Sequence, residues 1–350
     1  MRLLDFESSR LKVEIRLSEQ LEAELLLNFL WGGKQVSKEK IKVLITGGAG
    51  YVGSVMVELF LKKGHLVTVL DDFRYHSTSL LYLCDYPGLS IVRGDVRARA
   101  VVKPLIAGAD IIIPLAAVVG APACELHPQD SKSINVGAIK LLNQLRGKRQ
   151  KVLFPVTNSG YGIGEKGVFC TEESPLRPIS RYGKQKVEAE KILMDKGDVI
   201  AFRLATAFGV SPRMRVDLMI NDFTYKAVRE GCIVLFEEHF KRNYIHVRDI
   251  SRAFYFGLTN FRRMKDEVYN VGLSNANLSK LELCRVIQKH LPNLVIIASD
   301  IGQDPDQRDY IVSNEKIEKA GFKPRYSLDY GIKNLIRAYT FLKDSVYDNL

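Results

Sequence analysis

The sequence predicts an α/β fold in which a doubly wound parallel sheet is joined to a smaller C-terminal α+β lobe. From residue 41 to residue 205, short apolar runs alternate with segments of helical periodicity. The first run leads directly into a glycine-rich turn, and beyond residue 205 the alternation loosens into short strands mixed with helices. Strands that alternate with helices in this way indicate a parallel sheet covered on both faces.

The expected elements follow one another as β-branched apolar runs and amphipathic helices. The run at 41–46 enters the glycine-rich turn, a helix over 52–62 ends before Gly64, and the next run at 66–70 ends at two aspartates. Glycine after the last periodic residue is a usual helix end. The further elements expected are strands at 90–93, 110–115, 152–156, 199–204, 233–236, 244–247 and 294–297, and helices at 135–146 and 182–193.

Residues 1–40 follow a different pattern from the rest of the chain. Leu and Ile alternate with Glu and Arg at helical spacing over 11–30, and acidic residues interrupt the apolar face, which argues against a signal peptide or membrane anchor. We expect 1–40 to be a helical N-terminal extension, with a docking or oligomerisation helix as the alternative. Residues 41–205 are expected to form the first domain and 206–350 mainly the second lobe, with later segments returning to the first.

The composition is that of a folded chain in a reducing compartment. With 46% hydrophobic and 26% charged residues, bulk disorder is excluded. No uncharged apolar stretch reaches the roughly 18 residues of a transmembrane helix. The five cysteines are scattered without a CxxC pair, which speaks against a zinc site and a disulfide framework. We therefore expect a cytoplasmic chain with no metal site and no membrane attachment.

Basic residues exceed acidic ones by 51 − 40 = 11. Such an excess is typical of proteins that bind nucleic acid, an anionic membrane surface or a phosphorylated small molecule. The basic residues are spread along the chain without a run of five or more, so we expect no nucleic-acid partner. The basic excess is still compatible with an anionic small-molecule substrate.

A dinucleotide-binding motif follows the first strand. Gly47, Gly50 and Gly53 form a GxxGxxG pattern, in which glycine permits a tight turn, close approach to a pyrophosphate and close packing of the helix whose N-terminus attracts the anion. Asp71 ends the second strand 18 residues after Gly53, where a carboxylate binds the ribose hydroxyls. The pattern predicts a Rossmann-type domain that binds NAD, since a carboxylate repels the 2′-phosphate of NADP; Arg74 nearby keeps NADP as an alternative. The same cofactor site is expected to include Tyr51, Val52 and Asp72.

Tyr182 and Lys186 form a YxxxK pattern that places both side chains on one face of a predicted helix. A phenol with an ordinary pKa of about 10 is a poor base at neutral pH. A neighbouring ammonium and a cationic nicotinamide ring would lower that pKa and stabilise a phenolate. Thr157 ends the fifth strand, where its hydroxyl can hydrogen-bond the same substrate oxygen. These motifs, in this order, predict Thr157, Tyr182 and Lys186 as catalytic residues.

Over residues 41–340 the chain resembles the extended short-chain dehydrogenase/reductase family, in its nucleotide-sugar epimerase/dehydratase branch. Shared segments include Gly94-Asp95-Val96, Tyr161-Gly162 and the stretch RNYIHVRD at 242–249, in which Asn243 replaces the usual Asp. The resemblance implies cofactor contacts, besides Tyr182 and Lys186, by Asp95, Val96, Leu115, Ala116, Ala117 and Asn135. It implies contacts to a nucleotide-sugar diphosphate by Asn221, Arg242 and Arg308. It also implies a homodimer formed through the helices at 135–146 and 182–193.

The resemblance implies that the first chemical step oxidises C4 of the sugar, with Tyr182 as base and NAD as hydride acceptor. The 4,6-dehydratases carry an Asp-Glu pair directly after the catalytic Thr, where this chain has Asn158 and Ser159, so we expect these two to contact substrate without dehydrating it. Ser159 also stands where 3,5-epimerases have an acid/base Cys. Cys124 is an alternative acid/base, but a buried neutral thiol is the stronger expectation.

If the chemistry is confined to C4, the two activities that stay possible are those of a 4-dehydrogenase and a 4-epimerase. The segments TNSGYGIG at 157–164, SPRMR at 211–215 and FEEHF at 236–240 resemble enzymes that oxidise C4 of GDP-linked manno-heptose in polysaccharide precursor synthesis. That resemblance implies a GDP-manno-heptose-type 4-dehydrogenase, with a nucleotide-sugar 4-epimerase as the alternative. Arg213 and Arg215 are expected to meet a diphosphate or an acidic sugar. A non-catalytic NAD-sensing protein is an alternative of another class, disfavoured because Tyr182 and Lys186 are both present.

Overall fold

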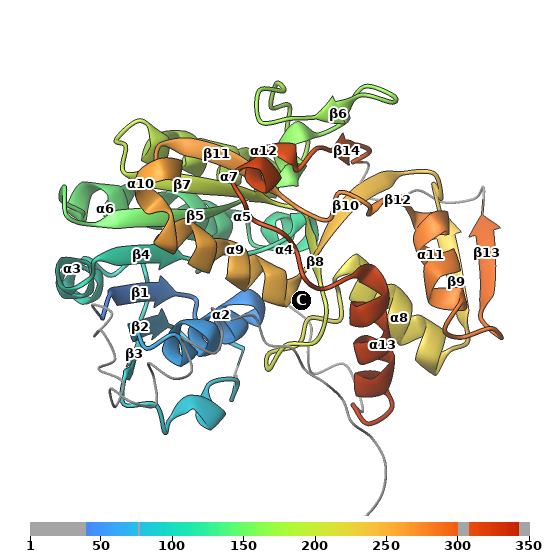
Figure 1. The fold of residues 1–350 in the computed structure, drawn as a ribbon, viewed down its shortest axis with the longest axis horizontal. Coiled ribbons are helices and arrows are strands. Elements are labelled where there is room, and N and C mark those ends of the chain that lie inside the picture. The colour runs from blue at the N-terminus through green and yellow to red at the C-terminus, as the bar shows by residue number, and fades with distance from the viewer. Residues whose placement is uncertain (1–39, 76–77, 300–307, 343–350) are drawn as a thin grey trace, which may run out of the picture. The chain divides into compact units, whose positions relative to one another are not determined.

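The computed structural model describes residues 40–75, 78–299 and 308–342, and its central element is a seven-stranded parallel sheet (Figure 1). The strand order is β11-β7-β5-β4-β1-β2-β3, and every neighbouring pair is parallel. The strands are β1 (Lys42–Thr46), β2 (Leu66–Asp71), β3 (Leu89–Arg93), β4 (Ile111–Pro114), β5 (Lys151–Thr157), β7 (Val199–Leu204) and β11 (Glu267–Val271). The chain builds outwards from β1 to β3 and then, through β4, in the other direction, which confirms the predicted doubly wound fold.

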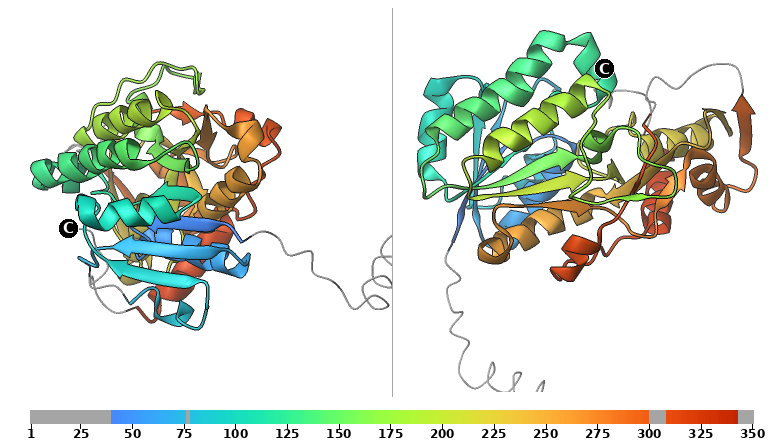
Figure 2. Two further views of the ribbon diagram at one scale, coloured as in Figure 1. Left: turned by 90° about the vertical axis from the view of Figure 1, so that its left-hand side faces the viewer. Right: turned by 90° about the horizontal axis from the view of Figure 1, so that it is seen from above.

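Helices cover both faces of the sheet because successive side chains of a strand point to opposite faces. In β1, Val43 and Ile45 pack into the core cluster that also holds the buried faces of α2 (Tyr51–Lys62) and α9 (Val247–Thr259). Leu44 packs into a second cluster on the other face. The helices of that face are α3 (Arg99–Gly108), α6 (Ala138–Leu145) and α7 (Arg181–Met194), as Figure 2 shows from above. The predicted helix at 135–146 begins in the π-helical segment η2 (Ser133–Gly137).

The second half of the chain returns one strand to the sheet and forms smaller sheets beyond it. β11 pairs with β7 from Glu267 opposite Ile200 to Val271 opposite Leu204. In a three-stranded sheet, β10 (Lys241–His246) pairs with β12 (Asn277–Ser279) on one side and with β8 (Thr206–Phe208) on the other. Two further pairs are β13 (Val295–Ser299) with β9 (Cys232–Phe236) and β14 (Ile311–Val312) with β6 (Phe169–Cys170). The remaining helical segments are η1 (Leu81–Leu83), α4 (Ala121–Leu126), α5 (Pro128–Lys132), η3 (Asn158–Tyr161), α8 (Met219–Arg229), α10 (Phe261–Met264), α11 (Lys280–Gln288), α12 (Glu315–Lys319) and α13 (Leu328–Tyr339).

The predicted elements of the second half coincide with β9, β10 and β13 to within three residues at each end. The expected helix at 1–40 lies outside the described residues. The described residues from 41 onward form a single unit, and the division of that unit into two domains at residue 205 stays a prediction. None of the helices that the structure describes has the length and apolar composition needed to cross a lipid bilayer.

Candidate active site

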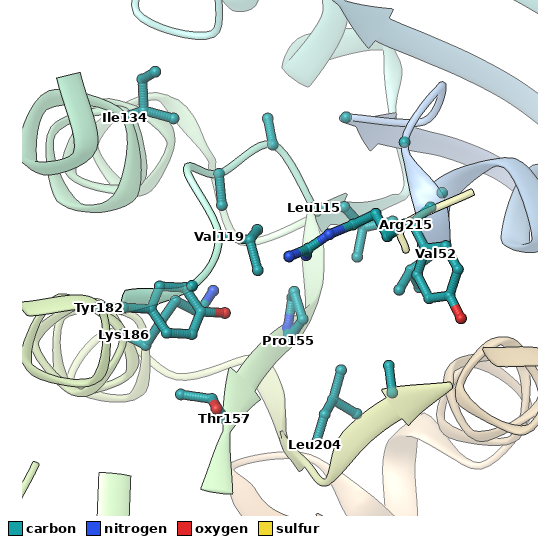
Figure 3. A pocket seen from close by; sticks show the side chains of 18 of the residues that line it. Val52, Leu115, Val119, Ile134, Pro155, Thr157, Tyr182, Lys186, Leu204 and Arg215 are labelled. Atoms are coloured by element: carbon teal, nitrogen blue, oxygen red, sulfur yellow. The ribbon is translucent and has the colours of Figure 1, made fainter. Parts of the chain in front are cut away.

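A cavity of about 300 Å³ lies at the carboxyl ends of the central strands (Figure 3). Its wall includes Gly47 after β1, Asp71 at the end of β2, Leu115 after β4 and Thr157 at the end of β5. In an open α/β sheet, ligands bind where the strand order reverses, here between β1 and β4. The predicted cofactor residues that line this cavity are Gly47, Gly50, Tyr51, Val52, Gly53, Asp71, Asp72, Asp95, Val96, Leu115, Ala116, Ala117, Tyr182 and Lys186.

The glycine turn brings backbone atoms closer together than any side chain would allow. Gly47 has a φ of +72°, and a Cβ atom there would lie 2.5 Å from the backbone nitrogen of Ala116. A Cβ atom on Gly53 would lie 2.3 Å from the carbonyl oxygen of Gly47. The turn ends at Gly50, where α2 begins with no acidic residue in its first turn. This helix start can therefore attract an anion such as a pyrophosphate.

The carboxylate of Asp71 joins the end of β2 to the glycine turn. It accepts hydrogen bonds from the backbone nitrogens of Ala49 (3.0 Å) and Phe73 (2.9 Å), and partial burial raises its pKa. Asp72 holds the guanidinium of Arg74 at 2.6 Å. Arg74 was the reason for keeping NADP as an alternative cofactor, and its charge is already paired with this carboxylate. The glycine turn, the N-terminus of α2 and the carboxylate of Asp71 at the end of β2 together fit a dinucleotide whose ribose carries no 2′-phosphate, such as NAD.

Thr157, Tyr182 and Lys186 face the same part of the cavity, as Figure 3 shows. Helix α7 starts one residue before Tyr182 because the Ser180 hydroxyl caps it, accepting a hydrogen bond from the Gly183 nitrogen at 3.1 Å. One helical turn later, the Lys186 side chain is buried with its Nζ 4.2 Å from the centre of the Phe154 ring. The strand end and the helix thus bring together the three predicted catalytic residues.

Burial sets the protonation of Tyr182 and Lys186. It raises the pKa of Tyr182 to about 12, an effect that the positive charges of Arg215 and Arg308 oppose. Burial lowers the pKa of Lys186 to about 7, and the carboxylate of Glu190 opposes that change. A phenolate at Tyr182 therefore depends on cations around the cavity.

Replacing Arg308 with Leu is expected to move the pH dependence of substrate oxidation to higher pH. The Arg308 charge lowers the pKa of Tyr182, so its removal raises that pKa, and the phenolate forms only at higher pH. Arg308→Lys keeps the charge and should shift the profile less. The measurement is kcat/KM against pH for the three proteins, and an unmoved acid limb in Arg308→Leu would contradict this electrostatic role.

The predicted cofactor residue Asn135 lies behind the cavity wall. Its side-chain amide donates to the carbonyl oxygen of Val118 (2.9 Å) and to Gln185 Oε1 (2.8 Å), and its oxygen accepts from the Val118 nitrogen (2.9 Å). Gln185 precedes Lys186 on α7, so Asn135 links the catalytic helix to the loop that follows β4. Direct contact between Asn135 and the cofactor stays a prediction.

Cys124 is a buried thiol next to this amide network, as the sequence led us to expect. Its side chain is fully buried, donates to the carbonyl oxygen of Val118 at 3.3 Å and does not belong to the described lining of the cavity. Burial raises its pKa to about 11, which keeps the thiol protonated at neutral pH.

Cys124→Ala is accordingly expected to leave kcat/KM within about twofold of the unmodified chain while costing about 1 kcal/mol of stability, the usual effect of a small buried truncation. Steady-state kinetics and urea unfolding check the two parts. A loss of turnover in a folded Cys124→Ala protein would restore Cys124 as an acid/base.

The structure divides the predicted substrate residues into two groups. Ser159, Arg213, Arg215 and Arg308 belong to the cavity lining, and Arg308 Nη1 contacts the Ser159 hydroxyl. Figure 3 shows Arg215 reaching across the cavity towards Val119. The predicted residues that are not among the described lining residues are Asn158, Asn221 and Arg242.

Each residue of the second group is buried beside the cavity. The amide of Asn221 bonds the Gly209 nitrogen (3.0 Å), the Arg215 carbonyl oxygen (2.8 Å) and the Tyr51 hydroxyl (3.3 Å), so it shapes the loop that carries Arg215. Arg242 lies 5.6 Å from the ring centre of Tyr310, a lining residue. Asn158 is 1% exposed, with both polar atoms of its amide lacking a hydrogen-bond partner. Their contacts to substrate stay predictions.

Tyr75, Thr206 and Tyr310 are among the lining residues that sequence reasoning missed. The ring of Tyr75 lies 4.6 Å from the guanidinium carbon of Arg213. Thr206 begins β8 directly after the end of β7, and this position at a strand's carboxyl end is the one signal that could have indicated it. No local pattern marks Tyr75 or Tyr310.

Comparison with known proteins agrees with this geometry. The sequence model of the NAD dependent epimerase/dehydratase family matches residues 43–272, most of the described chain. The chain belongs to this family. Its cofactor is accordingly NAD, and it is an enzyme of nucleotide-sugar epimerase/dehydratase type.

Two curated relatives show the degree of similarity. UDP-glucuronic acid decarboxylase 1 of Arabidopsis thaliana is 25% identical over 316 residues, covering 86% of this chain and 70% of that protein. UDP-glucose 4-epimerase of Lactobacillus helveticus is 28% identical over 275 residues, covering 71% of this chain and 82% of that protein. The crystal structure of a dTDP-glucose 4,6-dehydratase from Bacillus anthracis in complex with NAD has the same fold, with a TM-score of 0.75 at 23% identity over 86% of this chain and 96% of that chain.

Proposed function

We propose that this chain catalyses NAD-dependent oxidation at C4 of a nucleotide-diphospho-sugar. The observation that carries the proposal is the set of side chains available for proton transfer. Tyr182, Lys186 and Thr157 converge at one end of the cavity, and the described lining contains no Glu, His or Cys. Its acidic residues lie at the end of β2 (Asp71), directly after β2 (Asp72) and after β3 (Asp95), whereas Tyr182 lies on α7.

In the proposed reaction the Tyr182 phenolate removes the proton of the C4 hydroxyl while the C4–H bond breaks and the C4–O bond becomes a carbonyl. When bound, NAD would be the oxidant that accepts the hydride from C4. The Thr157 hydroxyl, which lies 2.9 Å from the Ser159 hydroxyl, hydrogen-bonds the reacting oxygen. Arg215 and Arg308 place positive charge near Tyr182 and favour the phenolate, and Lys186 adds to that charge in its protonated form. Dehydration and epimerisation at C3 or C5 need a further acid/base, for which Asn158 and Ser159 are unsuited.

The diphosphate of the substrate would meet Arg213, Arg215 and Arg308. Arginine forms charge-assisted, often bidentate hydrogen bonds with phosphate, and these three side chains line one cavity. Within this substrate class we propose a GDP-manno-heptose-type sugar and release of the ketone, that is, a 4-dehydrogenase. The resemblance of the segments 157–164, 211–215 and 236–240 to enzymes of that kind supports this choice.

A nucleotide-sugar 4-epimerase is the second candidate. It uses the same first step and then returns the hydride to the opposite face of C4. The relationship to UDP-glucose 4-epimerase, at 28% identity, favours it specifically.

The deciding experiment is the mass of the sugar nucleotide after incubation with near-stoichiometric protein and excess NAD. GDP-manno-heptose, GDP-mannose and UDP-glucose are tested in parallel, with the Tyr182→Phe protein as the control. Loss of two hydrogens identifies a 4-dehydrogenase, whereas unchanged mass with a new C4 epimer by NMR identifies a 4-epimerase. Loss of water or of carbon dioxide would overturn the restriction to C4.

We also propose a homodimer formed by the helices at 135–146 and 182–193. These helices pack against each other, with Lys140 Nζ 3.1 Å from Glu188 Oε1 on their exposed side. The second helix carries Tyr182 and Lys186, so the interface would adjoin the catalytic residues. Light scattering should give twice the chain mass of 39.5 kDa, and a monomer at micromolar concentration would contradict the proposal.

A further inference from the structure

A second concave site, which we term the basic groove, lies between α2, α9 and the loop at 321–326 that precedes α13. It encloses about 610 Å³, and Glu58 is the one acidic residue in its described lining. Figure 1 shows α2 and α9 side by side, with the chain running past them to α13. The cations that line the groove are Lys62, Lys63, Arg248, Arg252, Lys323 and Arg325.

Two of these cations are already neutralised, and four are available to an anion. Lys62 pairs with Glu58 at 2.6 Å, and Arg252 pairs with the buried carboxylate of Asp249. The other four cations have no carboxylate within salt-bridge distance among the residues that the structure describes: Lys63, Arg248, Lys323 and Arg325. A cleft lined by charges of one sign concentrates ligands of the opposite sign.

The groove is held in shape without a ligand. The carboxylate of Asp249 accepts hydrogen bonds from the backbone nitrogens of Arg325 (2.9 Å) and Tyr326 (2.8 Å), which ties the loop to α9. The Arg248 guanidinium donates to the Tyr330 hydroxyl at 3.2 Å and lies 5.7 Å from the Tyr326 ring centre. Because these groups are already ordered, binding there costs little additional entropy.

Aromatic rings line the groove together with the cations, and they distinguish it from a merely charged surface. They are Tyr255, Phe256, Phe322 and Tyr326. Lys63 Nζ lies 5.4 Å from the ring centre of Tyr255, and the Arg252 guanidinium carbon lies 5.6 Å from that of Phe322. Cations and aromatic rings therefore line the same cavity.

We propose that the basic groove is a second binding site, which takes a nucleoside polyphosphate. Its volume falls within the roughly 300–1,000 Å³ typical of small-molecule sites. The four available cations match the charge of a di- or triphosphate, and the rings offer a surface for the base. The groove shares no lining residue with the catalytic cavity.

Both helices of the groove also contribute to the catalytic cavity. The first turn of α2 supplies Tyr51 and Val52 to that cavity and its last turn supplies Lys62 to the groove, while α9 supplies Ile250 to the cavity and Arg252 to the groove. A ligand in the groove would thus contact the two helices that also line the catalytic cavity.

Isothermal titration of the full chain with GTP, in the presence of saturating NAD, tests the proposal. Lys63→Ala/Arg325→Ala removes two of the available cations and should weaken GTP binding at least tenfold. Lys103→Ala/Lys148→Ala removes the same charge from exposed positions outside the groove and should leave the affinity unchanged. Arg308→Ala alters the catalytic cavity, and this protein should also bind GTP in the basic groove with unchanged affinity.

Photocrosslinking of the unmodified chain with 8-azido-GTP locates the site independently of any variant, and the labelled peptides should come from α9 and residues 321–326. No GTP binding, labelling confined to the catalytic cavity, or an equal loss in Lys103→Ala/Lys148→Ala would overturn the proposal. Pyrophosphate binding as tightly as GTP would overturn the assignment of a nucleoside ligand. None of these outcomes depends on the reaction at C4, so the two proposals fail separately.

Discussion

The Tyr182→Phe protein is expected to oxidise its nucleotide sugar about 10²–10⁴-fold more slowly than the unmodified chain, the usual contribution of a positioned general base. The phenyl ring retains the volume of the side chain but cannot accept the C4 hydroxyl proton. Thr157 still lines the cavity, yet it does not replace the lost base, since its hydroxyl is not ionised at neutral pH. The measurement is the initial rate of NAD reduction at saturating substrate.

Binding of NAD separates this chemical effect from a structural one. Tyr182→Phe should keep most of its affinity for NAD, because it loses only one predicted cofactor contact, that of the hydroxyl, while the glycine turn and Asp71 are untouched. Tyr225→Phe, on α8 and outside the cavity lining, is the matched control and should keep the full rate. An intact Tyr182→Phe protein with unchanged turnover would refute the catalytic assignment, whereas NAD binding with no turnover in any protein would favour the NAD-sensing alternative.

The parts of the site that could be predicted from the sequence are those encoded by short spacings. Gly47 and Gly53 lie six residues apart, and the geometry of a strand, turn and helix brings them together whatever the rest of the chain does. The same holds for Tyr182 and Lys186, one turn apart on α7. The alternation of apolar runs and helices likewise indicated six of the seven strands of the sheet, because burial on both faces makes such strands continuously apolar.

Features that depend on distant contacts could not be predicted in this way. Strand β11 reads EVYNV, with polar residues between its apolar ones, and it joins the sheet only because β7 offers it an open edge. The amide of Asn221 bonds the Tyr51 hydroxyl from a position 170 residues away along the chain, and no local pattern indicated that contact. The basic groove illustrates the same limit, since its cations come from three segments and the sequence contains no polybasic run.

Gly53→Ala is expected to weaken NAD binding at least tenfold, about 1.4 kcal/mol. The added Cβ atom would lie 2.3 Å from the Gly47 carbonyl oxygen and 2.7 Å from the Gly48 Cα atom, and both of these are backbone atoms that no side-chain rotation can move. Helix α2 must therefore shift away from the turn, which separates the helix start from the pyrophosphate position. Forced overpacking of this kind also destabilises a fold by about 1–3 kcal/mol.

Gly108→Ala is the matched control, because it makes the same substitution at the last residue of α3, where a Cβ atom meets nothing within 4 Å. Alanine is the better helix former by up to about 1 kcal/mol, so this protein should be as stable as the unmodified chain or slightly more so, with unchanged NAD affinity. Titration calorimetry and urea unfolding measure both quantities on both proteins. If Gly53→Ala bound NAD normally, the close approach of α2 to the glycine turn could not be what positions the cofactor, and the anion would have to be held by the side chains of the cavity instead.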